Sequence, residues 1–205
     1  MPLPPPQRAQ RTLMHTRSVR IEAFRCDDGT RELEAELEDV CPIETPLPSG
    51  VCPAGQSLHL MRLRVTFDAG FEVIDVVAAS DRVPYGVDCE AVGPAYRKLI
   101  GLNLLRGFAI GLRERLGGIV GCTHLSELAR FLPSVAVQAV AGDKLRRREM
   151  FETGDAQRKR PFTLDGCHAW RSDGPVVERY MPMWYQPRKK AASEENSSVS
   201  RKEPS

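Results

Sequence analysis

The residue types that bind metals or act as nucleophiles gather at one short segment, Gly121-Cys122-Thr123-His124. The segment follows a glycine-rich turn and precedes a run with helical spacing, so Cys122 is expected at a helix amino terminus. Free amide groups and the helix dipole favour an anion there, and the thiolate is the form that ligates a metal or attacks carbon. A capping turn can bring His124 toward the same point. The alternative is a buried structural thiol beside a hydrogen-bonded histidine.

Further donor atoms lie in separate parts of the chain. Cys89 precedes an earlier expected helix as Cys122 precedes a later one, and two helix starts can meet when the helices pack side by side. Zinc and iron sites commonly draw ligands from separated elements, although the paired short spacings of zinc fingers are absent here. His59 also fits an ordinary hydrogen-bonded strand histidine. We expect a zinc or iron site whose candidate ligands are Cys89, Cys122, His124, Cys167 and His59.

One acidic residue interrupts an apolar strand pattern. Asp75 has apolar neighbours at positions 73, 74, 76 and 77. It is either a carboxylate that acts on the site or a strand-end residue that faces solvent. Asp75 and His124 are the candidate catalytic residues.

Composition and charge narrow the class of protein. The chain has 205 residues, of which 41% are hydrophobic, enough for one core, and a formal net charge of +2. Basic clusters at 146–148 and 158–160 are interrupted by acidic residues, which favours a solvated loop over a nucleic-acid site. The longest apolar stretch, 99–120, contains charged residues, so no membrane contact is expected. A small molecule is the partner that remains.

The amino terminus bears on the compartment. The first residues, Met-Pro-Leu-Pro-Pro-Pro, lack both the basic and the apolar region of a signal peptide. Without export, the six cysteines are expected as thiols rather than as disulfides. We therefore expect a cytoplasmic protein.

The elements that must position these residues begin with two hairpins. Residues 17–24 and 32–38 alternate between apolar and polar types around a glycine turn, and residues 58–67 and 71–78 repeat this pattern. The glutamate-rich segment 32–38 also has helical propensity, and we interpret it as a strand. Period two places His59 on the same face as the apolar residues of its strand. The proline-rich stretch 42–55 between the hairpins is expected to be a loop.

The middle of the chain carries helical spacing. Apolar residues recur at steps of three and four from Pro94 to Leu116, with Gly101 as a cap and Asn103 as the start of a second helix. A later helix follows Cys122 and is kinked or broken at Pro133. Residues 162–185 are expected to form a closing hairpin.

This order predicts an α+β fold, in which antiparallel hairpins form a sheet with a central block of helices on one face. Residues 17–186 form one predicted domain, between a disordered arm at 1–16 and a disordered tail at 187–205.

The Gly-Cys-Thr-His-Leu block at 121–125, with His59, Cys89 and Cys167, resembles a bacterial domain-of-unknown-function family, number 2889. The resemblance covers residues 15–186 and implies no activity. The resemblance implies an acidic residue directly after the histidine of the second hairpin, and this chain departs from that pattern with Leu60. Asp75 before two helix-starting cysteines is also similar in architecture to U-type iron–sulfur scaffold proteins.

Three kinds of function follow from these residues. The first is a Cys/His metal-binding protein or small metal-dependent enzyme that acts on a small metabolite. The second is a non-enzymatic scaffold or carrier for sulfur, a metal or an iron–sulfur cluster. The third is a metal-free module that binds a small ligand or a partner and buries its thiols.

Overall fold

The computed structural model describes residues 3, 5, 10–146 and 160–187, and it divides the chain into two units, 1–146 and 147–205. Most of the arm at 1–16, nearly all of the tail at 187–205 and the basic segment at 147–159 lie outside the described residues. The assignment of residues 17–186 to one domain stays a prediction.

Four long strands form an antiparallel sheet in the first unit, in the order β1-β2-β5-β6. They are β1 (Thr16–Arg25), β2 (Arg31–Val40), β5 (Ser57–Phe67) and β6 (Val73–Arg82). Asp28 and Asp68 close the two hairpin turns, because each carboxylate accepts a backbone N–H two residues later, at 2.9 and 2.8 Å. Both predicted hairpins, the strand at the glutamate-rich segment and the α+β class are confirmed.

The two faces of this sheet differ as the alternation requires. Outward-facing glutamates of β2 pair across the ladder with arginines of β5, Glu34 with Arg64 and Glu36 with Arg62. The inward positions are apolar and closed to solvent: Leu33, Ala35, Leu37, Met61, Leu63, Val65 and Phe67. The sheet therefore has one face exposed to solvent and one apolar face that must pack against other elements.

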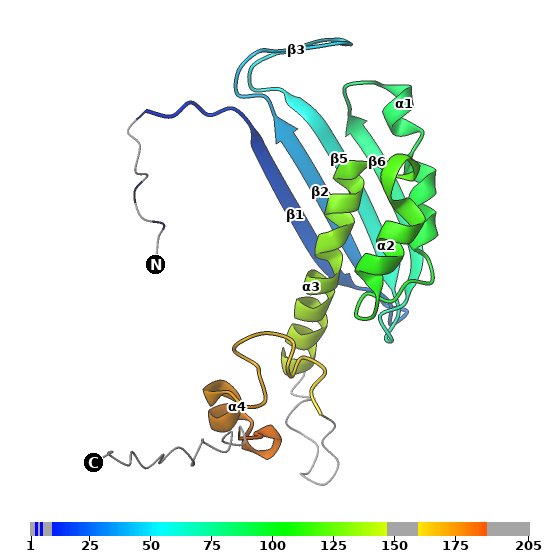
Figure 1. Cartoon of the computed structure of the whole chain (residues 1–205). Helices are drawn as coiled ribbons and strands as arrows, with labels where there is room; N and C mark the ends of the chain where they lie inside the picture. The colour runs from blue at the N-terminus through cyan, green and yellow to red at the C-terminus, as the bar shows by residue number, and fades with distance from the viewer. Residues whose placement is uncertain (1–2, 4, 6–9, 147–159, 188–205) are drawn as a thin grey trace, which may run out of the picture. The chain divides into compact units, whose positions relative to one another are not determined.

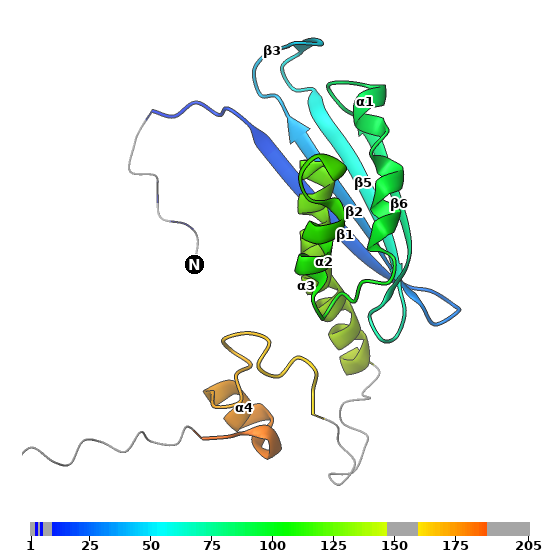
Figure 2. The same ribbon diagram turned by 45° about the vertical axis from the view of Figure 1, so that its right-hand side comes forward.

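Helices cover the apolar face, and both views show them on the same side of the sheet (Figure 1) (Figure 2). They are α1 (Val87–Glu90), the 3₁₀ helix η1 (Gly93–Leu99), α2 (Phe108–Leu116), the 3₁₀ helix η2 (Gly118–Val120) and α3 (Thr123–Arg146). The buried stripe of α3 includes Leu125, Leu128, Leu132 and Ala136. None of the described helices combines the length and apolar content needed to cross a bilayer.

The prediction of a helix start at Asn103 is wrong. Residues 101–104 run alongside the start of β6, since the amide of Val73 donates to the carbonyl of Leu102 at 2.9 Å and the amide of Leu104 donates to Phe71 at 2.9 Å. The chain turns into α2 only after Gly107, which adopts a left-handed φ of 68°. Pairing with the sheet thus overrides the helical spacing.

A break at Pro133 is also wrong, because α3 continues through this proline to Arg146. Proline inside a helix costs about 3 kcal/mol. Leu132 before the proline and Ala136 and Val140 after it are all buried. Burial of this stripe against the sheet offsets the cost.

Two further segments differ from expectation. The proline-rich stretch 42–55 contains a small hairpin, β3 (Thr45–Leu47) with β4 (Gly50–Cys52). In the described part of the second unit, residues 160–187, the closing hairpin is replaced by turns, a short helix α4 (Pro175–Tyr180) and a 3₁₀ turn η4 (Pro182–Trp184). Pro175 follows Gly174 and favours a helix start, where a strand would lose a ladder hydrogen bond.

A substitution at Gly121 tests how closely the chain packs against the end of α2 before it enters α3. A Cβ at this position would lie 2.3 Å from the carbonyl oxygen of Leu116, a backbone atom at the end of α2. We expect Gly121→Ala to lower the free energy of unfolding by about 1–3 kcal/mol, measured by urea denaturation. The matched control is Gly142→Ala within α3, where the nearest atom, on the Arg146 side chain, is 3.4 Å away. The control should raise stability slightly, and equal stability of Gly121→Ala and the wild type would contradict this account.

Candidate metal centre

A buried carboxylate lies at the centre of the site. Asp39 belongs to the inward positions of β2, in line with Leu37, and its side chain is 1% exposed. It is the only buried charged residue in the part of the chain that the structure describes. A buried charge is costly unless it is paired and hydrogen-bonded, so the residues around Asp39 decide whether this end of the sheet is stable.

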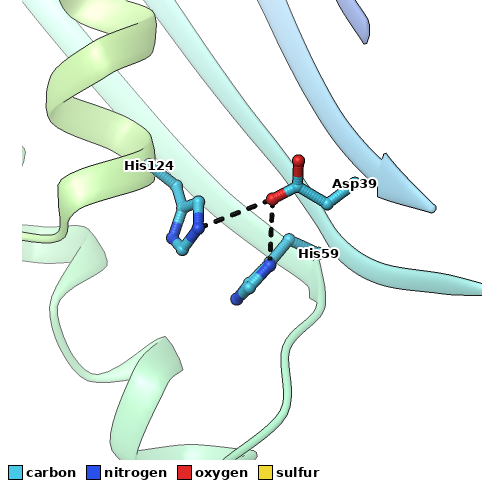
Figure 3. Close-up of side chains that lie close together, drawn as sticks. All are labelled: Asp39, His59 and His124. Atoms are coloured by element: carbon cyan, nitrogen blue, oxygen red, sulfur yellow. Dashed lines mark hydrogen bonds and ion pairs between the residues drawn. The ribbon is translucent and has the colours of Figure 1, made fainter. Parts of the chain in front are cut away.

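Two histidines from different elements point at one oxygen of this carboxylate (Figure 3). His59 lies opposite Asp39 in the β2–β5 ladder, and its Nδ1 is 3.1 Å from Oδ2. His124, in the first turn of α3, places Nε2 at 3.5 Å from the same oxygen. The imidazole ring centroids are 3.8 Å apart, and the three donor atoms lie within 4.8 Å of one another.

The first strand, β1, and the residue before it also contribute partners to this carboxylate. Arg17, opposite Asp39 in the β1–β2 ladder, donates from Nε to Oδ1 at 2.7 Å and from Nη2 to Oδ2 at 2.8 Å. Its remaining terminal nitrogen pairs with Glu127 of α3. His15 adds a contact of 3.0 Å between Nε2 and Oδ1. This two-pronged geometry is the strong form of an arginine–carboxylate pair.

These contacts change the pKa values at the site. Burial alone would raise the pKa of Asp39, but hydrogen bonds from Arg17 and His15 and the charge of Arg17 outweigh it and hold the pKa at about 2. Burial lowers the pKa of His59, and the charge of His124 lowers it further against the pull of Asp39. At neutral pH the site therefore combines an ionised carboxylate with a neutral imidazole, the forms that bind a metal.

Cys122 lies directly before α3 and is fixed through its backbone. The hydroxyl of the buried Tyr96 donates to the carbonyl of Cys122 at 2.7 Å and accepts from its amide at 3.0 Å. The Cys122 sulfur is 3.7 Å from Nδ1 of His124. Burial would raise the thiol pKa, but hydrogen bonds from His124 and from the amides of Leu125 and His124 outweigh it and lower the pKa. This is the helix-start thiolate environment that the sequence suggests.

The sequence-predicted site residues fall into two groups. The structure brings His59, His124 and Cys122 together. It leaves the half-buried Cys89 in α1, outside the three-atom cluster found among the described residues. Asp75 is half exposed and pairs with Arg97 at 3.2 Å, as a solvent-facing strand residue does. Cys167 is exposed and belongs to the second unit, so its role as a ligand stays a prediction.

The family model described as "Protein of unknown function (DUF2889)" matches residues 15–138. The chain belongs to the DUF2889 family. The DUF2889 match begins at His15 and ends within α3, so it contains the whole four-stranded sheet and every residue of the cluster. It stops before the closing segment that the sequence resemblance includes. No curated protein and no solved structure matches the chain.

Sequence reasoning missed the central residue of this DUF2889 site. The signal was present, because Asp39 continues the inward series of Leu33, Ala35 and Leu37, where the strand alternation calls for an apolar residue. Arg17 could then have been found from the hairpin register, which places it opposite Asp39. The contact of Glu127 with Arg17 joins residues 110 apart in sequence, and no local pattern indicates it.

The dependence of stability on pH tests whether the Asp39 carboxylate is ionised and paired in the folded protein. The pKa of Asp39 is lowered from its ordinary 3.8 to about 2, so its stabilising contribution is complete above the unfolded value and is lost as pH falls through the folded value. With a chelator present, we expect Asp39→Asn to be less stable than the wild type at neutral pH by about 2 kcal/mol or more. This difference should shrink between about pH 4 and pH 2. Asp75→Asn, on the exposed face, is the matched control, and a pH-independent difference for Asp39→Asn would contradict the assignment.

Proposed function

We propose that this DUF2889 protein is a metal-dependent enzyme that holds one zinc or ferrous ion on Asp39, His59 and His124 and acts on a small metabolite. The observation that carries the proposal is the convergence of three donor atoms, from two strands and one helix, within 4.8 Å of one another. Two imidazoles and one carboxylate are a common ligand set for both ions.

The interatomic distances support a shared ion. Zinc lies about 2.0–2.2 Å from nitrogen and oxygen ligands, so two donors on one ion are roughly 3–3.5 Å apart. His59 Nδ1 and His124 Nε2 are 3.1 and 3.5 Å from the Asp39 oxygen. Two of the three distances between donor atoms therefore already lie in the range expected for a shared ion.

The charges of the surrounding groups support a cation. Arg17 carries one positive charge and is shared between two carboxylates, Asp39 and Glu127. These three groups together leave one net negative charge, and the lowered pKa of the Cys122 thiol favours a further anion beside them. Each carboxylate oxygen has two acceptor sites, so the Arg17 bond to Oδ2 leaves one site free for a metal.

Three protein ligands favour catalysis over a purely structural role. Structural zinc sites are closed by four protein ligands, whereas catalytic sites keep a position open for water or substrate. A bound ion supplies a Lewis acid or an activated water. The chain orients the ligands, since Cys122 contacts the second ring nitrogen of His124 and Arg17 clamps Asp39. Such outer contacts tune metal sites.

Metal analysis of protein purified without a histidine tag tests the proposal. We expect about one equivalent of zinc or iron per chain, and its loss in His59→Ala, His124→Ala and Asp39→Asn. His168→Ala, in the second unit, is the matched histidine control and should keep the metal. Less than about a tenth of an equivalent in both aerobic and anaerobic wild-type preparations would favour the metal-free module. An iron–sulfur absorbance spectrum would favour the scaffold.

The variant Cys122→Ser tests whether Cys122 is itself a metal ligand or only orients the ligand His124. Because the Cys122 sulfur faces Nδ1 of His124, and Nε2 is the atom that faces Asp39, we expect the variant to keep the metal with about 10–100-fold weaker affinity, measured by competition with a chelator. Cys26→Ser is the control and should not change affinity. Complete loss of metal in Cys122→Ser would instead restore the thiol to the ligand set.

A further inference from the structure

The outer edge of β1 is long and open. Ten residues form this strand, and all except Ile21, which is partly buried, are exposed. Its only ladder among the described residues is with β2. The other edge of the sheet differs, because residues 101 and 102 pair with the backbone of Val73 at the start of β6 and η1 packs beside that strand. Edges of this length are usually blunted by charged residues, proline or a bulge; β1 has no lysine, proline or bulge, and its arginines and glutamate are the charges whose arrangement decides what can pair with it.

Apolar side chains line this open edge on the helix-covered face. Val19 is 37% exposed, and Ile21 and Ala23 follow it at inward positions of β1. Phe131 of α3 is 48% exposed. It lies one helical turn from Glu127, whose side chain pairs with Arg17 of β1. The edge therefore presents an apolar strip next to unpaired backbone groups.

The charges on the outer face of β1 are self-complementary. When two copies of one strand pair in antiparallel fashion, residues directly opposite each other point to the same face of the sheet. The two-fold axis that relates the copies must therefore pass through one residue position, and that residue lies opposite itself in the second copy. An axis at Arg20 or at Glu22 would place like charges opposite each other. An axis at Ile21 places Arg20 of each copy opposite Glu22 of the other, and it places Val19 opposite Ala23.

The remaining charged positions tolerate this register. An axis at Ile21 also brings Arg17 opposite Arg25 of the second copy. Arg17 is already paired with Asp39 and Glu127, and Arg25 is paired with Asp143 at 3.1 Å. Each guanidinium therefore arrives with its charge balanced.

We propose that a second copy of this chain is the partner of the β1 edge. The two copies pair their β1 strands antiparallel about a two-fold axis at Ile21, which joins two four-stranded sheets into one continuous sheet. The pairing satisfies the open backbone groups and covers the apolar strip. It does not depend on the metal proposal, because none of the three proposed ligands lies on β1.

Sedimentation of the full chain over a range of micromolar concentrations tests the dimer. We expect a species of twice the chain mass of 22.8 kDa. A monomer at every concentration, or an open series of larger species, would overturn the proposal.

Charge exchange tests the register. Glu22→Arg places arginines opposite arginines across the axis, and we expect it to weaken the dimer by about tenfold or more. Within the chain it places an arginine opposite Glu34, which favours folding. The double variant Arg20→Glu with Glu22→Arg restores opposite charges across the axis and should restore the dimer. This register would be overturned if Glu22→Arg left the dimer affinity unchanged, or if the double variant were folded but monomeric.

A second pair of variants tests the edge itself. Val19→Lys places a charge in the apolar strip and should give a folded monomer. Val77→Lys, at a half-exposed valine of β6, is the matched control and should remain dimeric. If both variants remain dimeric, the interface lies elsewhere.

Discussion

The need to compensate one buried carboxylate shapes the first unit of this protein. Asp39 lies on the apolar face of β2 with 1% of its side chain exposed, where an unpaired charge would cost several kcal/mol. Every strand or helix that reaches this point contributes a partner: β1 supplies Arg17, β5 supplies His59, and α3 supplies His124. The inward side chains of the central strands are otherwise apolar, so among the described residues this cluster is the place where a charged group enters the core.

The backbone leading into α3 is held with corresponding precision. Gly121 passes so close to Leu116 that a side chain would not fit, and the buried hydroxyl of Tyr96 bonds both backbone groups of Cys122. His124 is therefore placed over Asp39 by contacts made two and three residues earlier. This arrangement explains why glycine precedes the cysteine, and why a site formed by distant segments can have fixed geometry.

The sequence predicts much of this fold, and the reasons for the exceptions are physical. Alternation identifies the four long strands, and helical spacing identifies α3, because both follow from one-sided burial. Asn103 and Pro133 show the limits, since sheet pairing and core burial override local propensity at these positions. His59, His124 and Cys122 were recognisable by residue type. Asp39 was hidden in a glutamate-rich strand, where only its register distinguishes it from acidic residues that face solvent.

The compensation around Asp39 also bears on how the proposed metal site would coexist with a fold that forms without metal. Arg17 clamps the carboxylate through both oxygens and is shared with Glu127, so the charge of Asp39 is compensated in part without an ion. An ion would replace only the contacts from His59 and His124, and the pairs with Arg17 and His15 would persist. In a closed structural zinc site the ligands have no such substitute, and folding depends on the metal. Arg17 holds both oxygens of Asp39, whereas His59 and His124 contact only Oδ2, so under the proposed function the arginine clamp would serve folding and the histidines would serve the metal.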